Sequence, residues 1–173
     1  LRCISKLVHR TNFDFTEKKI SELKDMLCKE KPEMLFLCNP NNPNGKLFSK
    51  KIVMQLLECC KKTGTFVLLD ECFMDLTGKA DDFSLIEKIE SYRNLLIVNA
   101  LTKTFAVPGL RIGFCFCSSN EMILKITNQL PEWNVSVLAQ KIGSKLLLCK
   151  KFISETTKRL SIERKFLSDR LEK

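Results

Sequence analysis

Residues 34–70 read MLFLCNPNNPNGKLFSKKIVMQLLECCKKTGTFVLLD, and this stretch decides the fold. Residues 34–38 form a short continuous apolar run, which is typical of a strand buried on both faces of a parallel sheet, and residues 65–70 form a second such run. Between them, the prolines, asparagines and glycine of residues 39–45 forbid regular structure, and Ser49 is suited to cap a helix to about Thr63. The order strand, loop, helix, strand predicts an α/β fold.

The flanking segments extend this unit in both directions. Residues 1–10 predict a strand, and Thr16 is expected to cap a helix to about Cys28 that buries Ile20, Leu23 and Leu27. Residues 95–100 predict a third buried strand, and residues 112–117 a further one. Two more helices are predicted, over about 120–129 and about 136–148.

The overall composition fits a globular domain. The 173 residues suit one domain, and no apolar run is long enough to cross a membrane. The chain begins at Leu1 in mid-strand without a methionine, so we expect a piece of a longer protein.

The net charge of +9 admits nucleic acid, a membrane surface or a phosphorylated ligand as partner. Residues 150–173 carry eight basic and four acidic residues, and their apolar positions keep helical spacing: Ile153, Leu160, Leu167 and Leu171. This pattern predicts a long amphipathic helix with a solvated basic face. The basic residues are not interleaved with stacking aromatics, so nucleic-acid binding is not favoured.

Nine cysteines could suggest disulfides or zinc, but their count is odd, they lie inside apolar runs, and no CxxC pair exists. We therefore expect buried, reduced thiols in a cytoplasmic protein and no metal site. The single histidine, His9, argues against a histidine-based catalytic triad.

Polar features follow three predicted strands. The Asn-rich loop follows the first, Asp70 and Glu71 follow the second, and the loop of residues 99–113, NALTKTFAVPGLRIG, leaves the third. Ligands bind at the carboxyl ends of strands in such sheets, so we expect these features to lie at one edge. Lys103 and Arg111 are separated by a proline and a glycine, so no single helix joins them.

Each of these side chains suits a part of pyridoxal phosphate. A desolvated lysine captures a carbonyl, and an arginine binds a phosphate, although two solvated surface cations would be the simpler interpretation of Lys103 and Arg111 alone. An aspartate at a strand end needs a cationic partner, and a protonated pyridine nitrogen is one. The set therefore points to pyridoxal phosphate as cofactor.

The motifs NPNNPNG, LLDECF and LTKTFAVPGLRIGF, in this order, resemble the large domain of fold type I, class I and II aminotransferases. The resemblance implies a three-layer α/β sandwich with a mostly parallel sheet, ending in a long helix. It implies a partial cofactor domain over residues 1–149 and a helix over 150–173 that leads towards a small domain. A homodimer is also implied.

By this resemblance, Lys103 forms the imine with the cofactor and Asp70 pairs with its ring nitrogen. Asn42 binds the ring hydroxyl, Arg111 holds the phosphate, and Thr102 and Phe73 are further cofactor contacts.

Two branches that act on phosphorylated amino compounds look closest: threonine-phosphate decarboxylase of cobalamin biosynthesis and histidinol-phosphate aminotransferase. Phe73 in place of a tyrosine, the LTK and VPGLR motifs, and the segment PEWNVSVLAQ of residues 131–140 favour the decarboxylase. In this view Trp133, Asn134 and Asn42 contact the substrate, although Trp133 also suits a packing role. A class I or II aminotransferase is the alternative, and a non-catalytic module that binds a phosphorylated or nucleic-acid ligand is a more remote one.

Three positions depart from the family pattern: Ala100 lacks a hydroxyl for the phosphate, Cys72 replaces an alanine, and Ser136 replaces an asparagine. The Gly-rich phosphate turn and the carboxylate-binding arginine of the family have no counterpart in this chain. We therefore expect the chain alone to be inactive.

Overall fold

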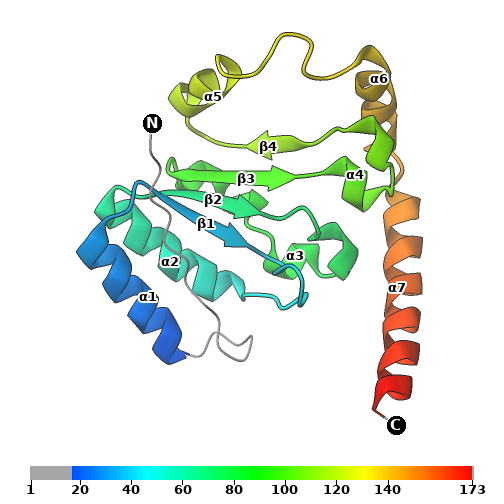
Figure 1. Cartoon of the computed structure of the whole chain (residues 1–173), viewed down its shortest axis with the longest axis horizontal. Coiled ribbons are helices and arrows are strands. Elements are labelled where there is room, and N and C mark those ends of the chain that lie inside the picture. Colours follow the sequence, from blue (N-terminus) through cyan, green and yellow to red (C-terminus); the bar gives the residue numbers. More distant parts are fainter. Residues whose placement is uncertain (1–16, 173) are drawn as a thin grey trace.

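The computed structural model describes residues 17–172. Its sheet has the strand order β1 (Met34–Cys38), β2 (Phe66–Asp70), β3 (Leu95–Asn99) and β4 (Phe114–Phe116), as Figure 1 shows. The first three strands are parallel, and β4 runs antiparallel to β3. The predicted α/β class with a mostly parallel sheet is confirmed.

Helices α1 (Glu17–Glu30) and α2 (Lys50–Thr63) form the main core with one face of the sheet. The predicted apolar face of α1 is buried, and α2 begins where predicted, because the Ser49 hydroxyl accepts a hydrogen bond from the Ile52 N–H at 3.4 Å. The buried helix residues are Ile20, Leu23, Leu27, Val53, Leu56, Leu57 and Cys60, and they join Leu37, Val67, Leu69, Leu95 and Ile97 of the strands.

Short elements connect β2 to β3 and β3 to β4. They are η2 (Asp75–Thr77), α3 (Ala80–Phe83) and η3 (Ile86–Ser91) in the first connection, and α4 (Leu101–Thr104) and η4 (Pro108–Leu110) in the second. Helices α5 (Asn120–Thr127), α6 (Val137–Leu146) and α7 (Lys150–Leu171) follow β4. The predicted first strand and the Thr16 cap lie outside the described residues.

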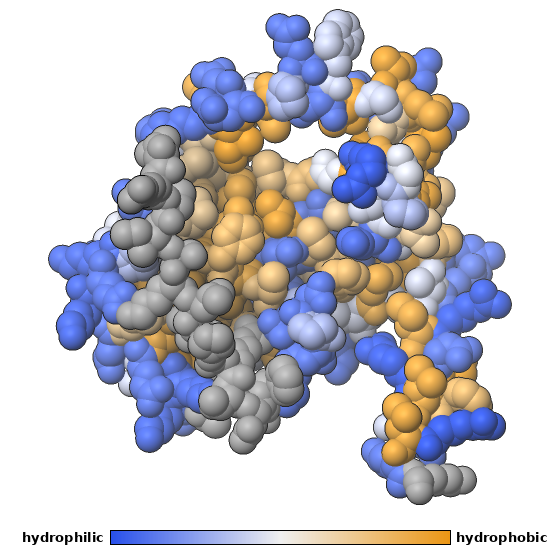
Figure 2. Space-filling model, viewed as in Figure 1, coloured by the Kyte–Doolittle hydropathy of each residue, from blue (hydrophilic) through white to orange (hydrophobic). Residues whose placement is uncertain are grey.

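The prediction that residues 34–38 are buried on both faces is wrong. Met34 and Phe36 are 50% and 65% exposed, whereas Leu37 is buried. Strand β1 is at the edge of the described sheet, and α1 and α2 pack on the face that carries Leu37. The other face of β1 contributes to the apolar surface that Figure 2 shows over the strands.

Helix α7 has nearly the predicted length, but its apolar side chains are not covered as an amphipathic core helix requires. No α7 residue is buried, and Leu160, Leu167 and Leu171 are exposed. The beginning of α7 packs on the domain, where the Phe152 ring stacks on Phe105 with centroids 5.6 Å apart. In Figure 1 the rest of α7 extends away from the sheet. No helix in the described part combines the length and apolarity needed to cross a membrane.

The cysteines are less buried than predicted. The eight in the described part form no disulfide; Cys60 is buried, whereas Cys28 and Cys149 are exposed and the rest are half-buried. Successive residues point to opposite faces of a strand and to different sides of a helix, so a cysteine within an apolar run can still face solvent. Residues 17–172 contain no cluster of three metal-ligating side chains.

Glu71, directly after β2, is a fully buried acid. Its carboxylate accepts hydrogen bonds from the Ser84 hydroxyl at 2.6 Å and from the Leu85 N–H at 2.9 Å. Burial raises the pKa of this carboxyl, and the two hydrogen bonds oppose the rise. Glu71 thus fixes the start of η3 to the end of β2.

Gly113 allows β4 to approach the end of β3. A Cβ atom at this position would lie 2.7 Å from the Asn99 carbonyl oxygen, which is too close for any side chain. Gly109, in η4, has no atom within 4 Å of its corresponding position. The antiparallel pairing of β4 therefore requires glycine at position 113.

We expect Gly113→Ala to destabilise the full-length protein by about 1–3 kcal/mol, because β4 must move away from the backbone of β3. Gly109→Ala is the matched control, and its effect should stay within about 0.5 kcal/mol. Urea unfolding of both variants measures the difference. Equal stabilities of the two variants would contradict the close approach.

Glu71→Gln should change how stability depends on pH. The pKa of the Glu71 carboxyl is higher in the folded protein than its ordinary value of 4.5. The contribution of this group to the free energy of unfolding is therefore fully present below pH 4.5 and is lost as the pH rises through the folded-state pKa. The glutamine variant stays neutral, so it should gain stability relative to wild type as pH rises above 4.5. Urea unfolding across this pH range tests the change, with exposed Glu90→Gln as control; parallel curves for wild type and Glu71→Gln would refute it.

Candidate functional site

Asp70 lies at the carboxyl end of β2, level with Cys38 of β1 and Val98 of β3. Its Oδ1 accepts a hydrogen bond from the Cys72 N–H at 2.9 Å, and the Cys38 thiol donates to Oδ2 at 3.7 Å. Within residues 17–172 no ion pair involves Asp70. The carboxylate is thus oriented by two neighbours, and no cationic side chain of the described residues forms an ion pair with it.

Cys72 is a neutral neighbour of this carboxylate. Burial, followed by the adjacent Asp70, raises the pKa of the Cys72 thiol to about 12, and the charge of Lys103 opposes the rise. The thiol therefore adds no negative charge between Asp70 and Lys103.

Lys103 is in α4, just after β3, and its Nζ lies 5.5 Å from the centroid of the Phe73 ring. Phe73 follows Asp70 by three residues, so the segment after β2 meets the start of the connection from β3 to β4 here. The Thr104 hydroxyl donates to Asp75 Oδ2 at 2.9 Å and ties α4 to η2. This bond helps to hold Lys103 against Phe73.

Two other predicted positions surround this lysine. Thr102, its neighbour in α4, is half-buried. Ala100 is the N-cap of α4 and offers no side-chain acceptor, as the departure from the family pattern predicts. Position 100, at the start of α4, therefore lacks the hydroxyl that the resemblance to the family implies.

The Asn-rich loop after β1 is closed by its own asparagines. Asn39 is fully buried; its side chain donates to the Phe48 carbonyl at 3.2 Å and accepts from the Phe48 N–H at 2.8 Å. The Asn41 side chain bonds Asn44 at 2.8 Å. These bonds leave Asn42 exposed in the loop that follows the strand beside Asp70.

Arg111 has the left-handed backbone conformation, with φ of 48°, which is unfavourable for a residue other than glycine. The side chain is exposed, and Nη1 donates to the Pro108 carbonyl at 3.4 Å. As predicted, α4 and η4 are separate elements, so no single helix joins Lys103 to Arg111. The two cations have different neighbours, Phe73 and Pro108.

Trp133 and Asn134 lie in the connection between α5 and α6, and both are exposed. Trp133 is 90% exposed and has φ of 58°. The interpretation of Trp133 as a packing residue is therefore wrong, because nearly the whole side chain is exposed. Within the described residues, the structure does not bring Trp133 into the cluster of Asp70, Phe73 and Lys103.

Cys38 and Asn39 have roles at this edge of the sheet that were not predicted from the sequence. The register of β1 and β2 places Cys38 beside Asp70, and Asn39 closes the loop through Phe48. Four asparagines stand in residues 39–45, and composition does not separate the buried one from the exposed ones. The position of Asn39 directly after the strand was the signal that could have predicted its role in closing the loop.

The donor set fits the cofactor expected from the sequence. Lys103 offers a primary amine with the centroid of the Phe73 ring 5.5 Å from its Nζ, and Asp70 offers a carboxylate that forms no ion pair within residues 17–172. Arg111 and Asn42 are exposed, in the segments that follow β3 and β1. A carbonyl compound with a basic ring nitrogen and a phosphate suits these groups.

Comparison with known proteins agrees with the fold and the motifs. A histidinol-phosphate aminotransferase from Flavobacterium johnsoniae is 35% identical over 132 residues, which is 76% of this chain and 34% of that protein. Other curated relatives, at 29–32% identity, carry the same name. The chain thus spans less than half the length of these relatives.

Solved structures share the fold. The histidinol-phosphate aminotransferase from Clostridium acetobutylicum superimposes with a TM-score of 0.81 and 27% identity, over 88% of this chain and 45% of that chain. The L-threonine-O-3-phosphate decarboxylase from Porphyromonas gingivalis gives a TM-score of 0.62 and 25% identity, over 70% and 37% of the two chains.

The family described as "Aminotransferase class I and II" matches residues 6–173, which is nearly the whole sequence. This match includes the Asn-rich loop, the Asp70 strand end and the Lys103 loop. The chain therefore belongs to the class I and II aminotransferase family.

Proposed function

We propose that the full-length protein is a pyridoxal-phosphate-dependent aminotransferase that acts on a phosphorylated amino compound such as histidinol phosphate. The observation that carries this proposal is the meeting of Asp70, Phe73 and Lys103 at adjacent strand ends, in a chain of the class I and II family. The names of the curated relatives support the substrate class.

Bound pyridoxal phosphate supplies an aldehyde that captures amines and a protonated ring that withdraws electrons from the captured substrate. Lys103 is the amine that holds the aldehyde and then moves a proton at the substrate Cα. Asp70, oriented by the Cys72 N–H, keeps the proton on the ring nitrogen. Arg111 binds the phosphate, Asn42 binds the ring hydroxyl, and Thr102 and Phe73 contact the cofactor.

The neutral Cys72 thiol supports the role given to Asp70. A thiolate at this position would compete with Asp70 for the ring proton and would attract the Lys103 ammonium. Because burial and the neighbouring Asp70 raise the pKa of Cys72 to about 12, its thiol is neutral at neutral pH and adds no negative charge near Asp70 and Lys103. The charges are thus arranged as the cofactor requires.

The curated relatives favour transamination over the decarboxylation preferred from the sequence. Phe73 is the observation that keeps threonine-phosphate decarboxylase as a second candidate, since it offers no phenol beside Lys103. Incubation of the full-length protein separates the two reactions: amino transfer from histidinol phosphate to 2-oxoglutarate supports the first, and CO₂ release from threonine phosphate supports the second.

The rest of the proposed assembly follows the family. Residues 1–149 form part of the cofactor domain, residues 150–173 lead towards a small domain, and two copies associate as a homodimer. Trp133 and Asn134 face the substrate in the complete protein. Size-exclusion chromatography with light scattering tests the dimer.

Lys103→Ala should abolish covalent attachment of the cofactor. Borohydride reduction of the wild-type full-length protein with added pyridoxal phosphate should fix the cofactor on the peptide that contains Lys103, and mass spectrometry detects it. The exposed Lys141, on α6, provides the control variant Lys141→Ala, which should still be labelled at Lys103. Absence of label in wild type would instead favour the non-catalytic ligand-binding alternative.

Arg111→Ala should weaken cofactor binding about 10- to 100-fold, because a charge-assisted contact to the phosphate is lost. The missing hydroxyl at Ala100 leaves Arg111 a larger share of phosphate binding. Fluorescence titration with pyridoxal phosphate measures the effect, and Arg93→Ala, an exposed arginine before β3, is the control. Unchanged affinity in Arg111→Ala would remove Arg111 from the site.

A further inference from the structure

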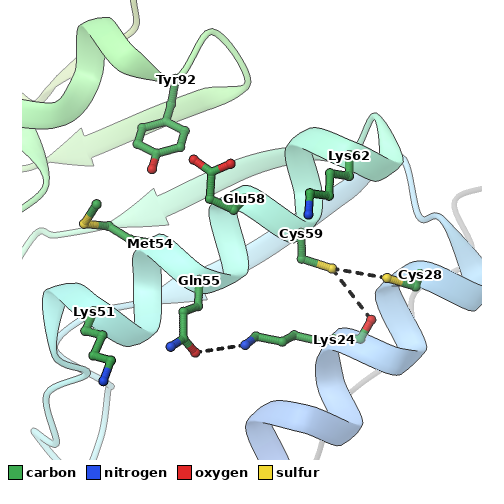
Figure 3. Close-up of a pocket in the computed structure, with 9 residues that line it drawn as sticks. All are labelled: Lys24, Cys28, Lys51, Met54, Gln55, Glu58, Cys59, Lys62 and Tyr92. Carbon is green, nitrogen blue, oxygen red and sulfur yellow. Dashed lines mark hydrogen bonds between the residues drawn. The ribbon is translucent and has the colours of Figure 1, made fainter.

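Two thiols face each other between the adjacent helices α1 and α2, outside the candidate site. Cys28 of α1 and Cys59 of α2 have their Sγ atoms 3.5 Å apart (Figure 3). A disulfide has its sulfur atoms about 2 Å apart, so a movement of about 1.5 Å would bring these two into bonding distance. Rotation of the exposed Cys28 side chain supplies movement of this size without unpacking the core.

The two helices keep these thiols close. Cys28 follows the buried Leu27, and Cys59 precedes the buried Cys60, so each thiol flanks the packed surface of its helix. The Lys24 Nζ donates to Gln55 Oε1 at 2.9 Å, and the Cys59 thiol donates to the Lys24 carbonyl at 3.7 Å. These contacts join α1 to α2 on the same side as the thiol pair.

A groove of about 720 Å³ leads to the pair and gives a small reagent access (Figure 3). Its charged side chains are three lysines and one glutamate, so the groove carries a net positive charge and favours an anionic ligand. Apolar surface from Met54 and Tyr92 lines another part of the groove. The charged lining residues are Lys24, Lys51, Glu58 and Lys62.

The two thiols differ in reactivity. Cys28 is exposed, whereas Cys59 is half-buried. Burial and the neighbouring Cys28 raise the pKa of the Cys59 thiol. Cys28 is therefore the thiol that an external reagent meets first, and Cys59 reacts second.

We propose that Cys28 and Cys59 form a reversible disulfide that links α1 to α2, through exchange with an anionic low-molecular-weight disulfide that enters the groove. This proposal does not depend on the proposed enzymatic function.

The exchange has two steps that balance. The Cys28 thiolate attacks one sulfur of the small disulfide and expels its other half as a thiolate, which leaves a mixed disulfide on Cys28. The Cys59 thiolate then attacks the Cys28 sulfur and expels the second half. In the net reaction the two protein thiols give two electrons to the small disulfide, and their two protons pass through solvent to the two expelled thiolates, which become two thiols.

Oxidised glutathione, an anionic disulfide, is the probe in the full-length protein. After incubation and quenching with an alkylating agent, non-reducing digestion and mass spectrometry should find a peptide that links Cys28 to Cys59. Cys149→Ser, which removes an exposed cysteine on another surface, should retain the linked peptide. Cys28→Ser should lose it, and excess reduced glutathione should reverse it in wild type.

The order of the steps is tested by Cys59→Ser. This variant lacks the second thiol, so it should accumulate a stable glutathione adduct on Cys28 that wild type does not retain. A wild-type protein that holds glutathione on Cys28 without forming the link, or that shows no reaction at Cys28, would overturn the proposal. Equal rates with the cationic disulfide cystamine would overturn the preference for an anionic reagent.

Discussion

The parallel pairing of β1, β2 and β3 is the constraint on which the site depends. It places Cys38, Asp70 and Val98 at the same level, so the chain segments that leave the three strands start from one edge of the sheet. Each segment then needs only a short local structure to aim its side chain. The Asn39 side chain closes the first loop, the Cys72 N–H orients Asp70 in the second, and Thr104 fixes α4 in the third.

The second constraint is that the charged side chains Asp70 and Lys103 at this edge of the sheet do not neutralise each other. Asp70 and Lys103 both act on the Cys72 thiol but belong to no ion pair in the part of the chain that the structure describes. An aromatic ring and a neutral thiol stand beside the lysine instead. Side chains that already neutralised each other would have little electrostatic attraction left for a ligand, so this separation keeps both groups available.

Much of the fold could be predicted because the strands are continuous apolar runs and the helices carry clear caps. Strand β1 and helix α2 begin and end at the predicted residues, and Ser119 and Ser136 cap their helices. Exposure could not be predicted in the same way. MLFLC is apolar at every position, so its sequence does not tell which face a helical layer will cover. The spacing of α7 likewise indicates a helix but not what packs on it.

The candidate residues were predictable as types, and their neighbours were not. Lys103 and Asp70 stand in recognisable motifs, whereas the contact of Lys103 with Phe73 depends on how α4 and the end of β2 fold. The pairing of Cys28 with Cys59 depends on the angle and register of two helices that are 31 residues apart at these positions. Such contacts arise from packing, which short-range sequence patterns do not encode.

The exposed apolar side chains of β1 have a practical consequence for the expression of this chain. Met34 and Phe36 are large and exposed, and they lie on a strand at the edge of the described sheet. An apolar edge strand can pair with the same strand of another molecule. The exposed apolar side chains of α7 form a second surface that can associate with another molecule. We therefore expect this chain to aggregate when it is expressed on its own, and its solubility at low protein concentration is the first property to establish.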